Sequence, residues 1–508
     1  MLYCSKGRRL ATRAALVVFS ASICAVWAQS QEDQLAEQSH HAKELMAEGR
    51  FAEAIPIYRE LVLATSGNPG FVLNLGLAEE MAGHPAEAAE QFESVLKTQP
   101  DNVPALTSLG TARLQLNQPK LAIGPLEKLI ALQPENRNAR GMLAGALMAT
   151  GRDNEAAEEY RKLAAGDGSD AQAWYGLGKA YEALADRSFE QLEKIAPESA
   201  YALTLVADSQ ASRVQYRSAF FFYKQAEGKK PDLLTLHAGL AHVYAKSGHD
   251  DWAREEQKQE QKLAAASCAH RSTACNFLAG KYLEAARGAG ATPDGLFWAA
   301  KAYNALALGA FEQLGKLPDS VQIHALKANI LRGHRQYLEA VNEWRAALKL
   351  APGDPRLEHE LAAALFLAND YKTLIPMLQS ELAKGDRSAD TNFMLGESFL
   401  RSEQPDKAIP YLEAALKAQP SMKPADASLG LALALVNKPV EAIPHLEKAL
   451  DLDDDGSLHY QLARAYQAKG DTQRARQLMT QYQQIQGANQ QHKEEVAREA
   501  QITAPSTQ

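Results

Sequence analysis

Residues 174–181 read Trp174-Tyr175-Gly176-Leu177-Gly178-Lys179-Ala180-Tyr181. Trp174, Leu177 and Tyr181 are spaced so that they share one face of a helix. Gly178 leaves a gap on that same face, because it has no side chain. Since two helices approach closely only where small residues make room, this stretch predicts a helix that packs tightly against a second helix.

The same spacing recurs in segments that start at residues 35, 69, 103, 137, 171, 200, 234, 321, 355, 389, 423 and 456, the first five of them 34 residues apart. The eighth residue of every segment is small: Ala42, Gly76, Gly110, Ala144, Gly178, Ala207, Ala241, Ala328, Ala362, Gly396, Gly430 and Ala463. The twentieth residue, on the facing helix, is Ala in all segments but two, where Glu190 and Leu374 stand. A generic Ala- and Leu-rich bundle would not keep one phase in this way, so the sequence predicts a helical repeat array.

Helix-breaking residues fall at two fixed places in the segments. Prolines stand just past the second helix, at Pro100, Pro134, Pro231, Pro352 and Pro420. Glycines mark the turn between the two helices, at Gly49, Gly83, Gly151 and Gly248. No long stretch shows the period-two alternation that strands need.

The pattern W-x2-L-G-x2-Y at 174–181, followed elsewhere by sets such as Ala88, Phe92 and Pro100, resembles the tetratricopeptide repeat, a 34-residue helix–turn–helix unit. The resemblance implies an all-α, right-handed superhelical solenoid of about twelve such units, with two irregular joints made by long helices. It covers nearly the whole chain after residue 28. No room is therefore left for a separate catalytic domain, and we expect a protein that is not an enzyme.

The two expected joints are similar to each other. Lys179-Ala180-Tyr181 and Phe189-Glu190-Gln191-Leu192 return, 122 residues later, as Lys301-Ala302-Tyr303 and Phe311-Glu312-Gln313-Leu314. Each copy continues without an internal proline, to Pro197 or Pro318. We interpret both as unusually long helices within a duplicated block, whose bulky aromatic residues fill the joint.

The first 28 residues have the features of a secretory signal peptide. Lys6, Arg8, Arg9 and Arg13 form a basic segment, and the apolar run behind it ends in Ala25-Val26-Trp27-Ala28. This run is shorter than the roughly 20 residues of a membrane span, although an uncleaved anchor remains the alternative. Because the chain has no Asn-x-Ser/Thr sequon, we expect an exported protein of the bacterial envelope, periplasmic or secreted.

These features divide the sequence into five parts. They are the signal peptide (1–28), the first four repeats (29–170), repeats with two long-helix segments and a Cys-containing loop (171–320), the last five repeats (321–488), and a polar disordered tail (489–508). Without residues 1–28, 50 of the 54 basic residues remain against 62 acidic ones, a net charge of −12. This charge argues against nucleic acid as a partner. Membrane contact is expected only if the signal segment stays uncleaved.

Two cysteines remain after the signal segment, Cys268 and Cys275. In an exported protein we expect them to form a disulfide that pins an irregular stretch. A metal site would need more ligands than this pair and His270 supply.

Other fragments that suggest chemistry are incomplete. His359-Glu360-Leu361-Ala362-Ala363 begins like a zinc-protease helix but has Ala where the second histidine is required. Asp451 to Gly456 matches the first half of a calcium loop, yet Leu462 stands in place of the bidentate Glu. We therefore predict no catalytic residue, no metal and no cofactor.

By resemblance to the family, the second, fifth, ninth and twelfth residues of each unit face a concave groove. In repeats two to four the candidate groove residues are Leu73, Leu77, Thr107, Thr111, Leu114, Gly141, Gly145 and Met148. These side chains are neutral, so they suit an amphipathic helix or an extended apolar segment better than an acidic peptide terminus. Packing against neighbouring units is the alternative role.

The expected function is a scaffold or adaptor for protein or peptide partners in the cell envelope. Two alternatives stay open: a membrane-tethered assembly factor for a secretion or polysaccharide-export machine, and a non-catalytic subunit of an envelope enzyme complex. The fold alone does not choose among them.

Overall fold

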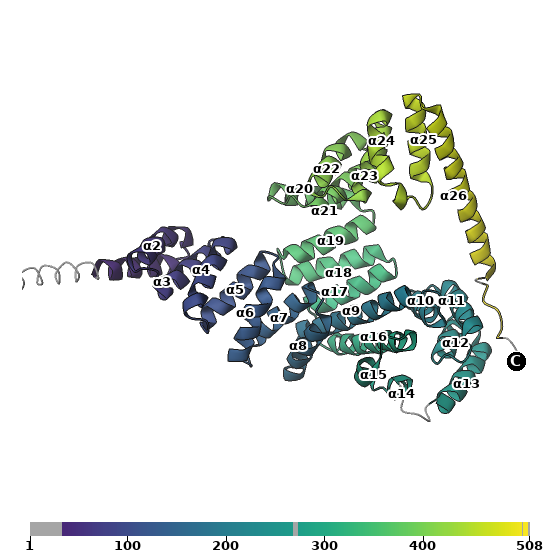
Figure 1. The fold of residues 1–508 in the computed structure, drawn as a ribbon, viewed down its shortest axis with the longest axis horizontal. Coiled ribbons are helices and arrows are strands. Elements are labelled where there is room, and N and C mark those ends of the chain that lie inside the picture. Colours follow the sequence, from purple (N-terminus) through teal and green to yellow (C-terminus); the bar gives the residue numbers. More distant parts are fainter. Residues whose placement is uncertain (1–32, 268–272, 500, 506–508) are drawn as a thin grey trace, which may run out of the picture. The chain divides into compact units, whose positions relative to one another are not determined.

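The computed structural model describes residues 33–267, 273–499 and 501–505, and throughout these ranges it consists of helices and short connections (Figure 1). The predicted signal peptide lies outside these ranges. The chain forms two compact units, Met1–Tyr181 and Glu182–Gln508. The boundary between them falls inside one long helix, not at residue 171 or 321, where the sequence pattern changes.

Unit 1 is a regular array of helical hairpins. A first helix over residues 33–47 is followed by α2 (Phe51–Ala64), α3 (Pro69–Met81), α4 (Pro85–Thr98), α5 (Val103–Gln115), α6 (Pro119–Leu132), α7 (Arg137–Ala149) and α8 (Asp153–Gly166). Helices α3, α5 and α7 begin at the predicted repeat starts 69, 103 and 137. The all-α repeat prediction is confirmed here.

Unit 2 contains most of α9 (Ala171–Ile195) and then two hairpins, α10 (Ala200–Ser212) with α11 (Tyr216–Lys229) and α12 (Leu236–Lys246) with α13 (Asp250–Ser267). Next come α14 (Thr273–Leu278), α15 (Tyr282–Gly288) and α16 (Pro293–Gly315). The remaining helices are α17 (Val321–Gly333), α18 (Tyr337–Leu350), α19 (Pro355–Leu367), α20 (Tyr371–Ala383), α21 (Ala389–Arg401), α22 (Pro405–Ala418), α23 (Lys423–Leu435), α24 (Pro439–Lys448), the short η1 (Leu450–Leu452), α25 (Ser457–Lys469) and α26 (Thr472–Glu499). Among all described helices, none combines the length and apolar character needed to cross a bilayer.

The small residue at the eighth position is required by the close packing of each hairpin. A Cβ atom built on Gly110 would lie 2.7 Å from Cδ2 of Leu126, which is fully buried on the facing helix. Gly76 meets Phe92 in the same way, again at 2.7 Å. Where the residue is Ala, as at Ala144, its side chain is fully buried. The steric reason for the repeat pattern is thus confirmed.

Helix ends in unit 1 are fixed by residues that repeat with the array. The side-chain oxygens of Asn102 and Asn136 each accept a hydrogen bond, 3.0 Å long, from the backbone N–H three residues later. Asp170 caps α9 similarly, over 2.8 Å to the N–H of Ala173. The turns between the paired helices use a left-handed residue, for which Gly83 (φ 84°) is suited by its lack of a side chain.

The predicted long helices are confirmed as α9, with 25 residues, and α16, with 23. The segment that starts at 171 is therefore one uninterrupted helix, not a helix–turn–helix unit. Neither Gly nor Pro stands between Tyr181 and Pro197, and the buried residues Leu184 and Leu192 continue one apolar face through the stretch where a turn would be needed.

The stretch before α16, predicted to be irregular, contains a short helical pair. Phe277 of α14 packs against Tyr282 of α15 and Trp298 of α16, with ring centroids 5.2 and 5.4 Å apart. Trp298 and Phe297 are buried, so these aromatic residues do fill the joint. Cys275 in α14 is disulfide-bonded; its predicted partner Cys268 lies outside the described residues.

The C-terminal region differs from its expectation. The polar segment from residue 489 is helical up to Glu499, because α26 continues through it. Beyond α26, Ile502 is half-buried and packs against the core formed by α10 to α13 and α16. Residues 501–505 are therefore ordered by a contact that their composition does not indicate.

Candidate functional site

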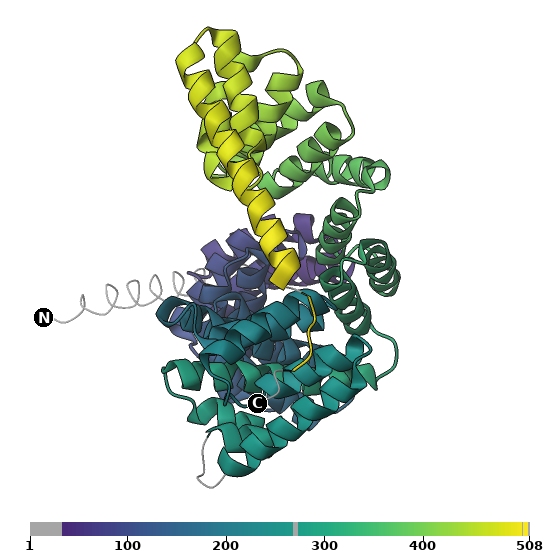
Figure 2. The ribbon, with the colours of Figure 1, turned by 90° about the vertical axis from the view of Figure 1, so that its right-hand side faces the viewer.

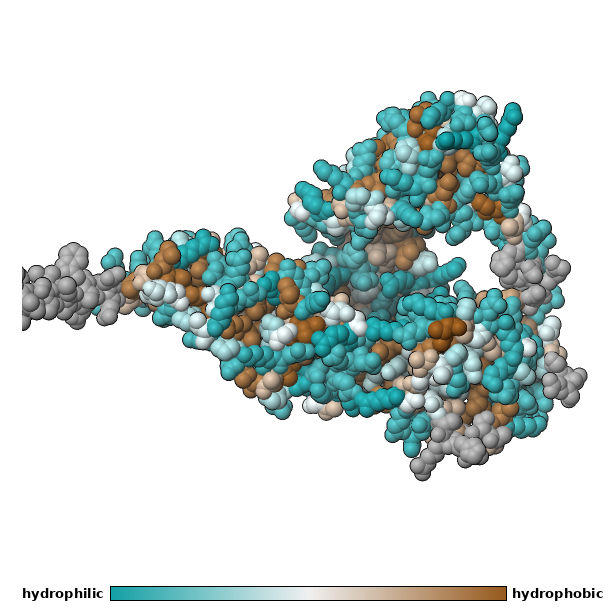
Figure 3. Space-filling model, in the orientation of Figure 1, coloured by the Kyte–Doolittle hydropathy of each residue, from teal (hydrophilic) through white to brown (hydrophobic). Residues whose placement is uncertain are grey.

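The candidate groove residues all lie on first helices of hairpins in unit 1. Leu73 and Leu77 are on α3, Thr107, Thr111 and Leu114 on α5, and Gly141, Gly145 and Met148 on α7. All eight are of intermediate exposure, neither buried in the core nor fully open to solvent. On the face drawn in Figure 3, apolar patches lie among polar surface over this array.

Leu73 and Leu77 are each partly packed against other helices and partly exposed to solvent. Leu73 and Leu77 pack against a buried cluster that includes Phe92 of α4 and Leu109 of α5. Phe92 belongs to the same hairpin and Leu109 to the next one, so both leucines have the packing role considered above. Because both side chains also keep part of their surface exposed, the same residues present apolar area to a partner.

The two threonines offer little hydrogen-bonding capacity outward. The hydroxyl of Thr107 donates to the carbonyl of Val103 (2.9 Å), and that of Thr111 to the carbonyl of Thr107 (3.1 Å). Both donors are thus satisfied within α5. Neither hydroxyl hydrogen is therefore left to donate to a partner, which suits an apolar partner surface.

Space is available on α7. A Cβ built on Gly141 would meet no atom within 4 Å, and one on Gly145 would meet only the hydroxyl of Tyr160, at 3.9 Å. Unlike the glycines at the eighth position, these two are not required for packing within a hairpin. They leave the surface of α7 open to close approach by another chain.

One charged residue belongs to the same set and was missed. Glu80 occupies the twelfth position of the second repeat, next to Leu77 in the pattern. Burial raises its pKa, while a hydrogen bond with Ser108 has the opposite, smaller effect. Its place in the repeat was readable from the sequence, so the groove is less neutral than the eight predicted residues indicate.

Several other charged residues in unit 1 form ion pairs between successive repeats. Arg59 contacts the buried Glu79 over 2.9 Å, Arg137 contacts Asp170 over 2.7 Å, and Arg113 pairs with Glu93. These side chains join consecutive hairpins. These ion pairs account for the charged residues that form them, so no bound ligand is needed to explain those residues.

Three residues of unit 2, Glu227, His237 and Glu256, lie close enough together to be tested as a metal site. Nδ1 of His237 lies 2.6 Å from Glu256 Oε2, and Nε2 lies 2.8 Å from the carbonyl oxygen of Pro231. Both ring nitrogens face acceptors, so a protonated imidazolium fits and no lone pair is left for a metal. Burial alone would lower the pKa of His237, but hydrogen bonds to Glu256 and Pro231 outweigh it and raise that pKa. The cluster is a buried ion pair that closes the α12–α13 hairpin.

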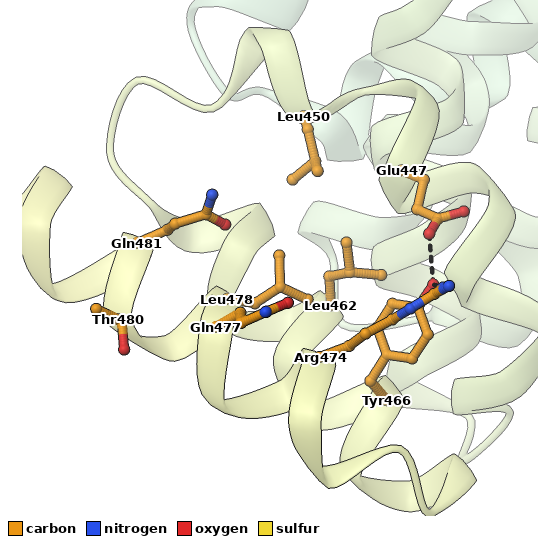
Figure 4. Close-up of a pocket in the computed structure, with 9 residues that line it drawn as sticks. All are labelled: Glu447, Leu450, Leu462, Tyr466, Arg474, Gln477, Leu478, Thr480 and Gln481. Atoms are coloured by element: carbon orange, nitrogen blue, oxygen red, sulfur yellow. Dashed lines mark hydrogen bonds between the residues drawn. The ribbon is translucent and has the colours of Figure 1, made fainter.

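A cavity of about 540 Å³ lies among α24, α25 and α26 (Figure 4). Leu462 and Leu478 form its apolar part, and the guanidinium of Arg474 donates to the hydroxyl of Tyr466 over 2.7 Å. That hydroxyl in turn donates to Glu447, a bond that raises the pKa of Tyr466. The polar groups here satisfy one another, and their combination does not match a known catalytic set.

The acidic segment at 451–455 has structural partners. Asp453 accepts hydrogen bonds from the backbone N–H groups of Leu458 and His459, at the start of α25. Asp451 pairs with Lys423. Two of the carboxylates that resemble a calcium loop therefore cap or join helices.

Comparison with known proteins gives matches to family models described as tetratricopeptide repeat, over residues 45–112, 113–180, 393–457 and 458–485. No curated protein matches the sequence.

Several solved structures are similar in part. YrrB, described as a TPR protein with an unusual peptide-binding site, is 22% identical over 33% of this chain and 87% of its own, with a TM-score of 0.29. MamA from Desulfovibrio magneticus RS-1 is 22% identical over 34% of this chain and 97% of its own, with a TM-score of 0.29. A protein from Parabacteroides merdae is 12% identical over 65% of this chain and 98% of its own, with a TM-score of 0.31.

Proposed function

Because the chain is a tetratricopeptide repeat protein, we propose that it is a non-catalytic scaffold that binds a protein partner along the first helices of unit 1. Repeats of this kind generally bind proteins or peptides. The proposed partner segment is an amphipathic helix or an extended apolar segment. The proposed location is the bacterial cell envelope, after export.

One observation carries the proposal for the groove. The eight residues at corresponding positions of α3, α5 and α7 are all half-exposed and uncharged, and Glu80 is the charged exception in this row. Such a row gives a partner apolar contact area over three consecutive hairpins. The open space at Gly141 adds room for its backbone.

The groove can be tested by adding charge to it. Leu77→Glu, Thr111→Glu and Met148→Glu together place three carboxylates where we propose apolar contact, and desolvating them opposes binding. We expect an affinity pull-down of residues 29–508 from envelope extract, with mass spectrometry, to retain a reproducible partner, which the triple variant loses.

A matched control carries the same charge change elsewhere. Leu63→Glu, Leu121→Glu and Leu132→Glu alter exposed residues on the second helices α2 and α6. This control should retain the partner. If the groove variant, still folded by circular dichroism, binds as well as the control, the groove assignment is wrong.

The location rests on residues 1–28 and has its own test. We expect N-terminal sequencing of the exported protein to begin at Gln29. A chain that retains Met1 and fractionates with membranes would instead favour the tethered assembly factor. Co-purification in fixed proportion with an envelope enzyme would favour the alternative of a non-catalytic subunit.

A further inference from the structure

The last described residues of the chain, 501–505, contact a hairpin far from them in sequence. Tyr244 of α12 donates a hydrogen bond of 2.8 Å from its hydroxyl to the carbonyl oxygen of Thr503, across a separation of 259 residues. The side chain of Ile502 packs against the core of α10 to α13 and α16. In Figure 1 this tail runs from the end of α26 down beside α11, and in Figure 2 it lies in front of the helices of that region.

The surface that receives the tail is an aromatic platform. The ring of Tyr244, itself fully buried, has the ring of Phe220 at 5.7 Å and that of Trp252 at 5.6 Å. Trp252 also stacks on His249 at 4.0 Å. A buried tyrosine hydroxyl requires a hydrogen-bond partner. Here a carbonyl of the tail supplies that acceptor.

The groups of the tail that contact this platform are not specific to one sequence. Residues 501–505 read Gln-Ile-Thr-Ala-Pro, carry no charge and have no helical structure. Gln501, Thr503 and Ala504 are exposed, whereas Ile502 and Pro505 are half-buried, and the side chain of Ile502 packs against the core. The hydrogen bond from Tyr244 is to a main-chain carbonyl, which any residue can provide. The platform therefore recognises an extended backbone with a branched aliphatic side chain, rather than one unique sequence.

We propose that the surface around Tyr244 is a binding site for extended, uncharged peptide segments that carry a branched aliphatic residue. Residues 501–505 occupy this site in cis until such a segment from a partner displaces them. A tethered segment has an effective concentration in the millimolar range, so a partner must overcome that competition. The site lies in unit 2 and does not depend on the groove in unit 1.

The experiment uses the full-length chain and a fluorescein-labelled peptide of residues 499–508. Ile502→Asp places a charge on the tail's apolar anchor and so releases the tail in cis. We expect fluorescence anisotropy to show that the Ile502→Asp chain binds the peptide at least about tenfold more tightly than the wild-type chain, whose own tail competes. Tyr244→Phe in the Ile502→Asp chain should weaken that binding, because the hydroxyl donor is lost.

Two outcomes would overturn the proposal. The first is a folded Ile502→Asp chain that does not bind the peptide at millimolar concentration. The second is equal binding to both chains, since the tail would then not occupy the site. A peptide with Asp in place of Ile is the matched control and should bind neither chain. If Ile502→Asp loses helical signal in circular dichroism, Ile502→Ala replaces it in the same titration.

Discussion

Gly110 and Gly141 are both helical glycines of unit 1, yet their surroundings are opposite. A side chain on Gly110 would collide with Leu126, whereas one on Gly141 would enter open space. The difference follows from their positions in the repeat, the eighth and the fifth. Close packing is a local requirement that the sequence pattern records, which is why the buried core could be predicted residue by residue.

This pair gives a sharp test of the packing. Gly110→Leu should lower the stability of the fold by about 1–3 kcal/mol, because the new side chain overpacks the hairpin. Gly141→Leu should be neutral or stabilising by up to about 1 kcal/mol, because it replaces a flexible residue by a good helix former. Thermal and urea denaturation followed by circular dichroism measure both. An unchanged melting temperature for Gly110→Leu would contradict the repeat frame.

The sequence was less informative about turns. Val214 has φ 62° and Arg335 has φ 60°, values that Gly or Asn adopts more easily. They occupy the turns after α10 and α17, at the place that Gly83 and Gly151 take in two other hairpins. Because surrounding packing can impose this conformation on other residue types, a search for Gly alone misses these turns.

At the scale of a single hairpin, α12 and α13 are joined by an ion pair. His237 and Glu256 are 5% and 4% exposed, and the pKa of His237 is raised in the folded chain. A raised pKa means that the pair contributes its full stabilisation below about pH 6.5, the value for an unfolded histidine. The contribution is lost as the pH rises through the higher folded pKa.

The consequence is a pH-dependent stability of this hairpin. We expect the melting temperature of wild type to exceed that of Glu256→Gln most clearly near about pH 6, and the difference to shrink toward about pH 9. Denaturation of both proteins across this range measures the effect. A constant difference at every pH would show that His237 does not carry the charge.

Whole elements were predicted where the pattern was strong and missed where it was short. The long helices α9 and α16 followed from two stretches without an internal proline. The pair α14 and α15 was not foreseen, since six and seven residues are too few to show a helical period. Their stability depends on tertiary contacts, such as that between Phe277 and Trp298.

For the chain as a whole, the repeat pattern predicts the helical array but not the contact between residues 501–505 and α12. The groove positions could be placed from the repeat frame, although Glu80 was overlooked among them. The contact between Tyr244 and Thr503 could not be predicted, because nothing in the polar C-terminal sequence specifies a partner 259 residues earlier. Only the three-dimensional path of unit 2 brings the two together.

That contact also bears on how such a chain can change by gene duplication and recombination. In unit 1, Asn102 and Asn136 each end a repeat and cap the helix that follows. Loss of residues 103–136 would therefore place Asn102 directly before α7, in the position of Asn136, and leave a shorter but intact array. Between α17 and α26 the same event would shorten the path that brings Thr503 to Tyr244. Descendants of this sequence should therefore vary in repeat number before residue 171 and keep it constant after residue 321.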